Sequence, residues 1–145
     1  MREIKIAKKE HISALARLEA ATFFEPWSEK SLELFLDSQN FCVLCLEDGN
    51  LASYCTVTTV LDEAQIVNVA TDSLYKRRGC ARDVLREVIF ECEKRKIVLI
   101  SLEVRESNAP AIKLYEELGF TVAGKRKDFY KNPRENALVM IKNLD

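Results

Sequence analysis

The 145-residue sequence lacks long hydrophobic runs and a basic leader. No apolar stretch approaches the roughly 18–20 residues of a membrane-spanning helix, because Asp, Glu, Lys or Arg interrupts every candidate. The opening residues Met1-Arg-Glu-Ile-Lys carry mixed charge, whereas a secretory signal would begin with a basic segment and continue with an apolar one. We therefore expect a cytoplasmic protein with no membrane partner.

Net charge is also nearly absent, since 22 Lys and Arg residues oppose 23 Asp and Glu residues and leave a formal charge of −1. A general binder of nucleic acids needs a large positive surplus, so the composition argues against a direct nucleic-acid partner. It leaves room for one local phosphate site. The only histidine is His11, so a zinc site would have few ligands to draw on.

The five cysteines are an odd number in a chain without a secretory signal, which favours reduced thiols. Cys42 and Cys45 form a C-x-x-C pattern, but they lie in the strand-like run Phe41-Cys-Val-Leu-Cys-Leu46. Residues three apart on a strand point to opposite faces of the sheet. We therefore expect no metal or redox role for this pair, and no metal cofactor.

The spacing of apolar residues predicts the element order β-α-α-β-β-β-α-β-α-β-β. Strands are expected around Ile4 and over residues 41–47, 51–61, 64–71, 98–104, 120–130 and 137–144. Helices are expected over 10–21, after the N-cap Ser28, and over 79–96 and 108–118. This order predicts one domain over residues 1–145 of the α/β class, with a mixed, mostly antiparallel sheet, flanking helices and a central parallel β-α-β crossover.

The segment over residues 72–84 joins a strand to a helix and carries basic residues where the helix begins. Lys76, Arg77 and Arg78 precede the first turn, and Arg82 lies inside it. Cations are misplaced there unless an anion binds the free N–H groups, because a helix N-terminus already carries about half a positive charge. Gly79 would allow close backbone approach. The alternative is a solvated basic turn. The phosphate patterns G-x-x-x-x-G-K-[ST] and G-x-G-x-x-G are both absent.

The hexapeptide Lys76-Arg-Arg-Gly-Cys-Ala81 resembles the pyrophosphate loop [QR]-x-x-G-x-[GA] of the GNAT N-acetyltransferases, with Lys76 in place of the usual Gln or Arg. Residues 102–120, LEVRESNAPAIKLYEELGF, resemble the second signature of that family in the version typical of its RimI-type group. Pro26-Trp27-Ser28 and Arg134-Glu-Asn-Ala137 are similar to further segments of the group. The resemblance covers essentially the whole chain and implies the GNAT fold.

The resemblance also implies acetyl transfer from acetyl-CoA to a protein's N-terminal amine, in this group the N-terminal alanine of a small-subunit ribosomal protein. Amide formation from a thioester needs a base for the ammonium and an acid for the departing thiolate. On the strand expected over 98–104, alternation places Val98, Ile100, Leu102 and Val104 on one apolar face. Glu103 is the candidate base, expected on the other face with Ser101 and Arg105 and near aliphatic neighbours. The alternative is a structural glutamate paired with Arg105.

Tyr115 is the candidate acid. Asn108, Ile112 and Tyr115 share one helix face by their spacing, so that Asn108 could meet the pantetheine arm while Tyr115 reaches the sulfur. Spacing alone makes a tyrosine here more often a core residue than a catalyst, and the family context reverses that weighting. Asn108 could also serve only as a helix cap.

By the resemblance, the backbone of Val69, Ala70 and Thr71 would pair with pantetheine. The same resemblance assigns the pyrophosphate to the loop residues Arg77, Arg78, Gly79, Cys80, Ala81 and Arg82. Trp27 and Tyr130 would form the walls of the peptide slot, although Trp27 could instead anchor the core. Two other functions stay open: a GNAT enzyme for a small amine or a lysine side chain, and a CoA-binding regulatory module without catalysis.

Overall fold

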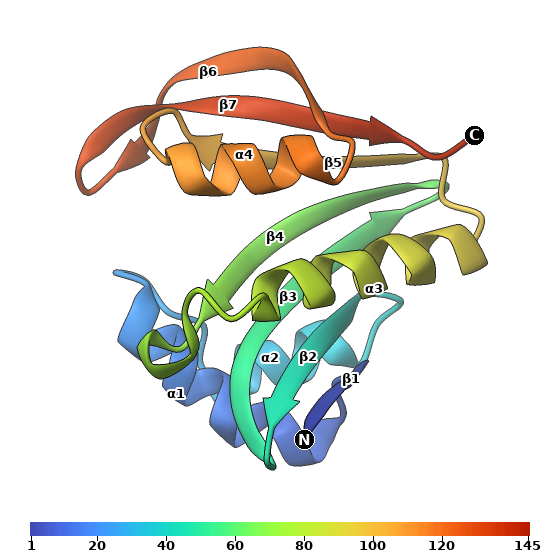
Figure 1. Ribbon diagram of the computed structural model, residues 1–145, viewed down its shortest axis with the longest axis vertical. Coiled ribbons are helices and arrows are strands. Elements are labelled where there is room, and N and C mark those ends of the chain that lie inside the picture. Colours follow the sequence, from blue (N-terminus) through green and yellow to red (C-terminus); the bar gives the residue numbers. More distant parts are fainter.

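The computed structural model describes all 145 residues and places every strand in one seven-stranded sheet (Figure 1). The order across the sheet is β1-β2-β3-β4-β5-β7-β6. All neighbours are antiparallel except β4 and β5, which are parallel, so the predicted α/β class and crossover are confirmed. The strands are β1 Arg2–Ile6, β2 Phe41–Glu47, β3 Asn50–Val60, β4 Glu63–Thr71, β5 Leu99–Arg105, β6 Thr121–Lys131 and β7 Arg134–Asn143.

Four α-helices flank the sheet, and the structure confirms the predicted caps of two of them. Ser28 caps α2 by accepting a hydrogen bond from the Ser31 N–H at 3.1 Å, and Asn108 caps α4 through the Ala111 N–H at 3.3 Å. Gly119 follows α4 with a φ of +97°, a left-handed angle that suits glycine. The helices are α1 Ile12–Thr22, α2 Glu29–Leu36, α3 Cys80–Lys94 and α4 Ala109–Glu117. None of them is long and apolar enough to span a membrane.

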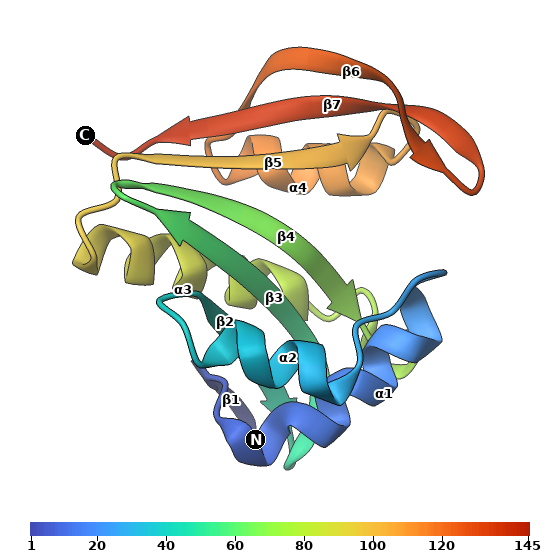
Figure 2. The same cartoon turned by 180° about the vertical axis from the view of Figure 1, so that it is seen from behind.

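Each face of the sheet has its own hydrophobic cluster. One face of β2 packs Val43 and Cys45 with α3, and the other packs Cys42 and Leu44 with α1 and α2. The two views of the ribbon agree, since α3 and α4 lie in front of the sheet in Figure 1, and α1 and α2 in Figure 2. The expectation that Cys42 and Cys45 point to opposite faces is confirmed.

The sheet splits between its two parallel strands. Only Glu63, Ala64 and Gln65 of β4 pair with β5, while β4 continues to Thr71. Beyond this point the register of β3 and β4 shifts between Thr56 and Val57, and β4 bends away from β5 (Figures 1 and 2). The second half of β4 therefore pairs with β3 alone and leaves its other edge open to a ligand.

The predicted strand over 98–104 is shifted by one residue to Leu99–Arg105. Ile100, Leu102 and Val104 are buried as expected, but Val98 is 38% exposed. The backbone of Val98 bonds to two other segments just before β5, since its N–H donates to the Asp62 carbonyl at 2.8 Å and its carbonyl accepts from the Leu144 N–H at 2.9 Å. Val98 therefore lies outside the buried face on which it was predicted.

Candidate active site

A cavity of about 710 Å³ opens where β4 and β5 separate. Its walls come from the end of β4, the loop before α3 and the outer face of α4. The structure brings together here most of the residues that the resemblance assigned to the cofactor, namely Val69, Ala70, Thr71, Arg77, Gly79, Cys80, Ala81, Arg82 and Asn108. Arg78 is the exception, since its guanidinium lies 5.4 Å from the centre of the Tyr75 ring and does not line the cavity.

The loop before α3 presents free backbone donors to this cavity. The first hydrogen bond of α3 runs from the Asp83 N–H to the Gly79 carbonyl at 3.1 Å. The N–H groups of Cys80, Ala81 and Arg82 therefore have no acceptor within the helix. Gly79 has a φ of +79°, a backbone angle that residues other than glycine adopt only with strain. The backbone angle itself calls for glycine here, since an added Cβ would meet only the Arg2 guanidinium, at 3.8 Å.

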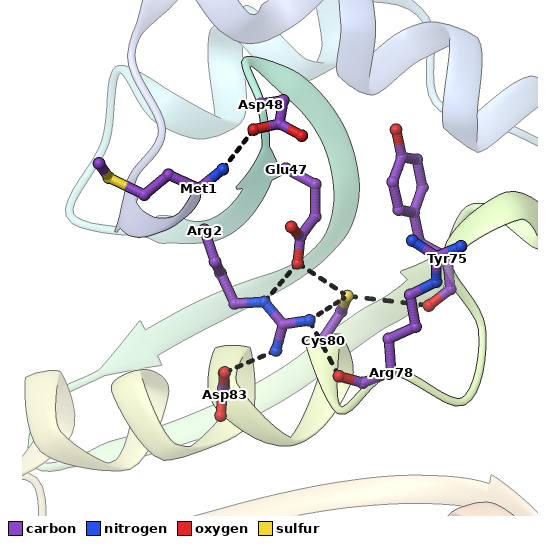
Figure 3. A network of polar contacts seen from close by, with 8 residues as sticks. All are labelled: Met1, Arg2, Glu47, Asp48, Tyr75, Arg78, Cys80 and Asp83. Atoms are coloured by element: carbon purple, nitrogen blue, oxygen red, sulfur yellow. Dashed lines mark hydrogen bonds and ion pairs between the residues drawn. The ribbon is translucent and has the colours of Figure 1, made fainter.

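Arg2 from β1 reaches this loop and the first turn of α3 (Figure 3). Its guanidinium donates to Asp83 Oδ2 at 2.8 Å, to the Arg78 carbonyl at 2.9 Å and to Glu47. The hydrogen bond to Asp83, followed by that to Glu47, raises the pKa of Arg2. Arg2 also contacts the Cys80 sulfur at 3.4 Å. One side chain thus fixes the carbonyl before Gly79 and the first turn of α3. No pattern in the sequence had marked Arg2 as a support of this loop.

Cys80 also belongs to a cluster with Cys45 and Glu47, whose ligand-type atoms all lie within 4.8 Å of one another. Burial, followed by the neighbouring Cys80, raises the pKa of Cys45 to about 12, so the thiolate that a metal needs is disfavoured. The Arg2 guanidinium already contacts both Glu47 and Cys80. A cation at this cluster would have to displace Arg2. All five cysteines are free and buried.

Positive charge dominates the side chains of the cavity. Arg82 forms an ion pair with Glu117 at 3.1 Å, linking the first turn of α3 to the last turn of α4. Lys76, Arg77 and Lys113 add further cations, whereas Glu117 is the only carboxylate in the lining. Together with the free N–H groups, these side chains suit a diphosphate.

Glu103 lies outside the cavity lining, and its surroundings differ from the prediction. Its carboxylate accepts a hydrogen bond from Gln65 Nε2 at 2.9 Å and pairs with Arg126 Nε at 3.2 Å. The expected aliphatic environment is therefore wrong, because Gln65 on β4 and Arg126 on β6 approach Glu103 from neighbouring strands. The alternative pairing of Glu103 with Arg105 is also wrong, because Arg105 Nη1 forms its ion pair with Glu135 Oε1 at 3.2 Å.

Tyr115 is 7% exposed and contacts Phe120 edge-on, with ring centres 5.9 Å apart. Burial raises the pKa of Tyr115, with smaller contributions from Cys55 and Tyr130. Burial also raises the pKa of Tyr130, and the charge of Glu103 is the next cause. Tyr130 thus lies within electrostatic range of both predicted catalytic groups. Of the predicted helix face, only Asn108 lines the cavity, since α4 turns a different face towards it.

Trp27 is partly buried in the loop between α1 and α2, with its ring centre 5.0 Å from that of Phe35. It packs against the cluster under α1 and α2, so it contributes to packing as well as to the surface. Tyr130 is partly buried, and the Arg105 guanidinium lies 4.3 Å from its ring centre. The α1–α2 loop and the β6–β7 turn extend to the same end of the molecule (Figures 1 and 2).

Comparison with known proteins decides the family. The profile of the Acetyltransferase (GNAT) family matches residues 12–120. The chain belongs to this family. An Escherichia coli protein named [Ribosomal protein bS18]-alanine N-acetyltransferase is 36% identical over 142 residues, covering 97% of this chain and 96% of that protein. A Salmonella typhimurium protein of the same name is 38% identical, with the same coverage. The predicted resemblance to the GNAT family and its RimI-type group is confirmed.

Solved structures agree with this assignment. The crystal structure of the ribosomal-protein-S18-alanine N-acetyltransferase from Escherichia coli matches with a TM-score of 0.91 at 35% identity, covering 100% of this chain and 95% of that one. Arabidopsis thaliana NAA60, solved with a bisubstrate analogue, matches with a TM-score of 0.89 at 14% identity and so shows the fold alone. As a GNAT member, the chain is an acyltransferase that uses acetyl-CoA as its acetyl donor. The diphosphate-compatible cavity fits that donor.

Proposed function

We propose that this acetyltransferase acts in the cytoplasm on the N-terminal amine of a ribosomal protein, the N-terminal alanine of bS18. The observation that carries the proposal is similarity along nearly the full chain, at 36% identity, to a relative named for that substrate. A putative bS18-alanine N-acetyltransferase of Bacillus subtilis, 33% identical over 94% of this chain, supports the same substrate. The site geometry is compatible with this reaction.

In this proposal the cavity holds the donor. The N–H groups of Cys80, Ala81 and Arg82 and the nearby cations bind the diphosphate. The open edge of β4 at Val69–Thr71 pairs with the amide groups of the pantetheine arm as an added strand would. Asn108 lies beside that arm, and its capping of α4 is compatible with ligand contact. When bound, acetyl-CoA supplies the thioester that is cleaved.

Two residues outside the cavity lining would move the protons. Glu103 accepts a proton from the substrate's ammonium, directly or through water, and the neutral amine forms the new N–C bond. Tyr115 gives its proton to the sulfur as the C–S bond breaks, and the second proton, which the nitrogen releases on becoming an amide, restores the Tyr115 hydroxyl. Burial raises the pKa of Tyr115, which keeps the hydroxyl protonated until a thiolate is there to receive the proton. Trp27 and Tyr130 form the walls of the slot for the protein N-terminus.

A peptide panel tests this function. Peptides that differ in their first residue, each with a free or a blocked N-terminus and an internal lysine, are incubated with acetyl-CoA and read by mass spectrometry. We expect one acetyl group on the free alanine peptide and none on the blocked one. Acetylation of the blocked peptide at lysine would favour the lysine alternative. Calorimetric binding of CoA without turnover on any amine would favour a regulatory module.

A further inference from the structure

Glu19 is a buried carboxylate that the proposed chemistry does not use. It lies on α1 and is 0% exposed. It forms none of the ion pairs of the structure, although a buried polar group normally needs hydrogen-bond partners. Three neutral donors surround it instead: the Trp27 backbone N–H, the Tyr54 hydroxyl and the Asn68 amide. A carboxyl group buried among three separate donors calls for an explanation beyond packing.

The two carboxylate oxygens have different partners. Oε1 accepts from the Trp27 N–H at 2.9 Å and so holds the α1–α2 loop. Oε2 accepts from the Tyr54 hydroxyl on β3 and from Asn68 Nδ2 on β4, the latter at 2.9 Å. Burial, followed by the neighbouring Glu19, raises the pKa of Tyr54, so its hydroxyl remains a donor. Glu19 therefore joins the loop to the sheet at one point.

This connection lies beside the open edge of β4 at the cavity. Asn68 directly precedes Val69, where the cavity lining of β4 begins. Trp27, at the other end of the connection, is the proposed wall of the peptide slot. The hydrogen bonds of Glu19 thus fix the position of Trp27, the proposed wall for the peptide, relative to β4, the strand that faces acetyl-CoA.

We propose that Glu19 is a positioning residue for the protein substrate: it sets the place of Trp27 relative to the open edge of β4. The proposal rests on the proposed function, because it takes Trp27 as the peptide wall. Glu19 itself touches neither substrate, since its side chain has no exposed surface.

The substitution Glu19→Gln separates the two connections while keeping the volume of the side chain. An amide offers one acceptor oxygen where the carboxylate offers two. If that oxygen keeps the two donors of Tyr54 and Asn68, the amide NH₂ faces the Trp27 N–H, and the loop loses its hydrogen bond. Glu91→Gln is the matched control, because the Glu91 side chain on α3 is 14% exposed and bonded to Arg95, which follows the helix, away from the cavity lining.

Trp27 is the only tryptophan, so its fluorescence reports the loop directly. We expect acrylamide to quench Trp27 more strongly in Glu19→Gln than in wild type, and equally in Glu91→Gln and wild type. Tyr54→Phe removes a donor from the sheet side only, so it should lower stability without raising the quenching. Equal quenching in Glu19→Gln and wild type, or an equal rise in Tyr54→Phe, would overturn the proposal.

Steady-state kinetics give the second readout. Glu19→Gln should raise KM for an N-terminal alanine peptide about tenfold, the effect of losing one buried hydrogen bond. KM for acetyl-CoA and kcat should stay close to wild type, as all constants should in Glu91→Gln. A purely structural role would lower the melting temperature and leave the peptide KM unchanged. If Glu19→Gln does not fold, Glu19→Asp keeps a carboxyl group on a shorter side chain and should show the same changes, and their absence would overturn the proposal.

The two proposals can fail separately. Quenching of Trp27 needs no acceptor, so it still decides the role of Glu19 if wild type acetylates no peptide. In that case the proposed function is wrong, and stronger quenching of Trp27 in Glu19→Gln still supports the connection between loop and sheet. If wild type acetylates the peptide and Glu19→Gln behaves like wild type in both readouts, only the role of Glu19 is wrong.

Discussion

The loop before α3 and the loop between α1 and α2 border the two halves of the site, and they are held in place by different means. The first is a tight turn with glycine at a positive φ, braced by the charged network of Arg2. The second lies against the core through Trp27 and is joined to the sheet by the neutral donors around Glu19. Binding a diphosphate requires several backbone N–H donors at fixed positions. The wall of a peptide slot requires only that one side chain stay in place.

This difference predicts that damage to one loop impairs one substrate and leaves the other nearly unaffected. Groups that act on the bond being broken should instead affect turnover and neither binding step.

The largest effect is expected from Tyr115→Phe, which removes the hydroxyl and keeps the ring packed against Phe120. If the hydroxyl supplies the proton to the departing sulfur, kcat should fall by roughly 10²–10⁴-fold. Acetyl-CoA affinity should change little, because the proton is needed only as the bond breaks. Stopped assays for kcat and calorimetry for affinity check both. Near-normal turnover would return Tyr115 to the core role that its spacing first suggested.

Gly79→Val should weaken acetyl-CoA binding by at least about tenfold, because valine resists a φ of +79° and a strained residue costs about 1–3 kcal/mol. Gly49→Val is the matched control. Gly49 has a φ of +84°, and an added Cβ would meet nothing within 4 Å, but it lies outside the cavity lining. Both variants should lose stability in thermal melts, and only Gly79→Val should lose affinity in calorimetry. An equal loss of affinity in both would refute the local explanation.

Trp27→Ala should raise the peptide KM about tenfold while leaving acetyl-CoA affinity unchanged, since truncating an aromatic anchor typically costs 1–2 kcal/mol or more of binding. Initial rates at varied peptide concentration measure this. Trp27 also contacts Phe35, so a thermal melt must accompany the kinetics. A variant that unfolds at the assay temperature would show that Trp27 is mainly a core anchor.

The smallest effect is expected from Arg2→Met, which leaves the Arg78 carbonyl and Asp83 without their shared donor. The phosphate loop should become less ordered, and acetyl-CoA affinity should fall about three- to tenfold, as for losing hydrogen bonds at a partly exposed charge. Arg95→Met is the control, because Arg95 also bonds a carboxylate, Glu91, and a carbonyl, that of Gln39, but away from the cavity. Equal acetyl-CoA affinity in the two variants would show that Arg2 does not support binding of acetyl-CoA.

The sequence predicted those parts of the site that neighbouring residues define. The turn around Gly79 and the capped start of α4 at Asn108 are local patterns, and the structure places both at the cavity. Arg2 and Cys80 lie 78 residues apart, and Glu19 and Asn68 lie 49 apart. No local pattern marks such contacts, because they arise only when helices pack on the assembled sheet.

The surroundings of Glu103 show the same limit. Alternation along β5 correctly placed Leu102 and Val104 on the buried face. It could not reveal that Gln65 and Arg126 approach Glu103 from other strands, since the pairing order of the sheet differs from the order of the chain.

Transfer of one acetyl group to the N-terminal amine of bS18 is tested most directly by incubating the purified protein with acetyl-CoA and unmodified bS18 and mapping the product by tandem mass spectrometry. We expect a single acetyl group on the N-terminal alanine, formed by wild type and strongly reduced with Tyr115→Phe. Unmodified bS18, or acetyl groups only on lysine side chains, would show that this protein does not carry out the proposed reaction.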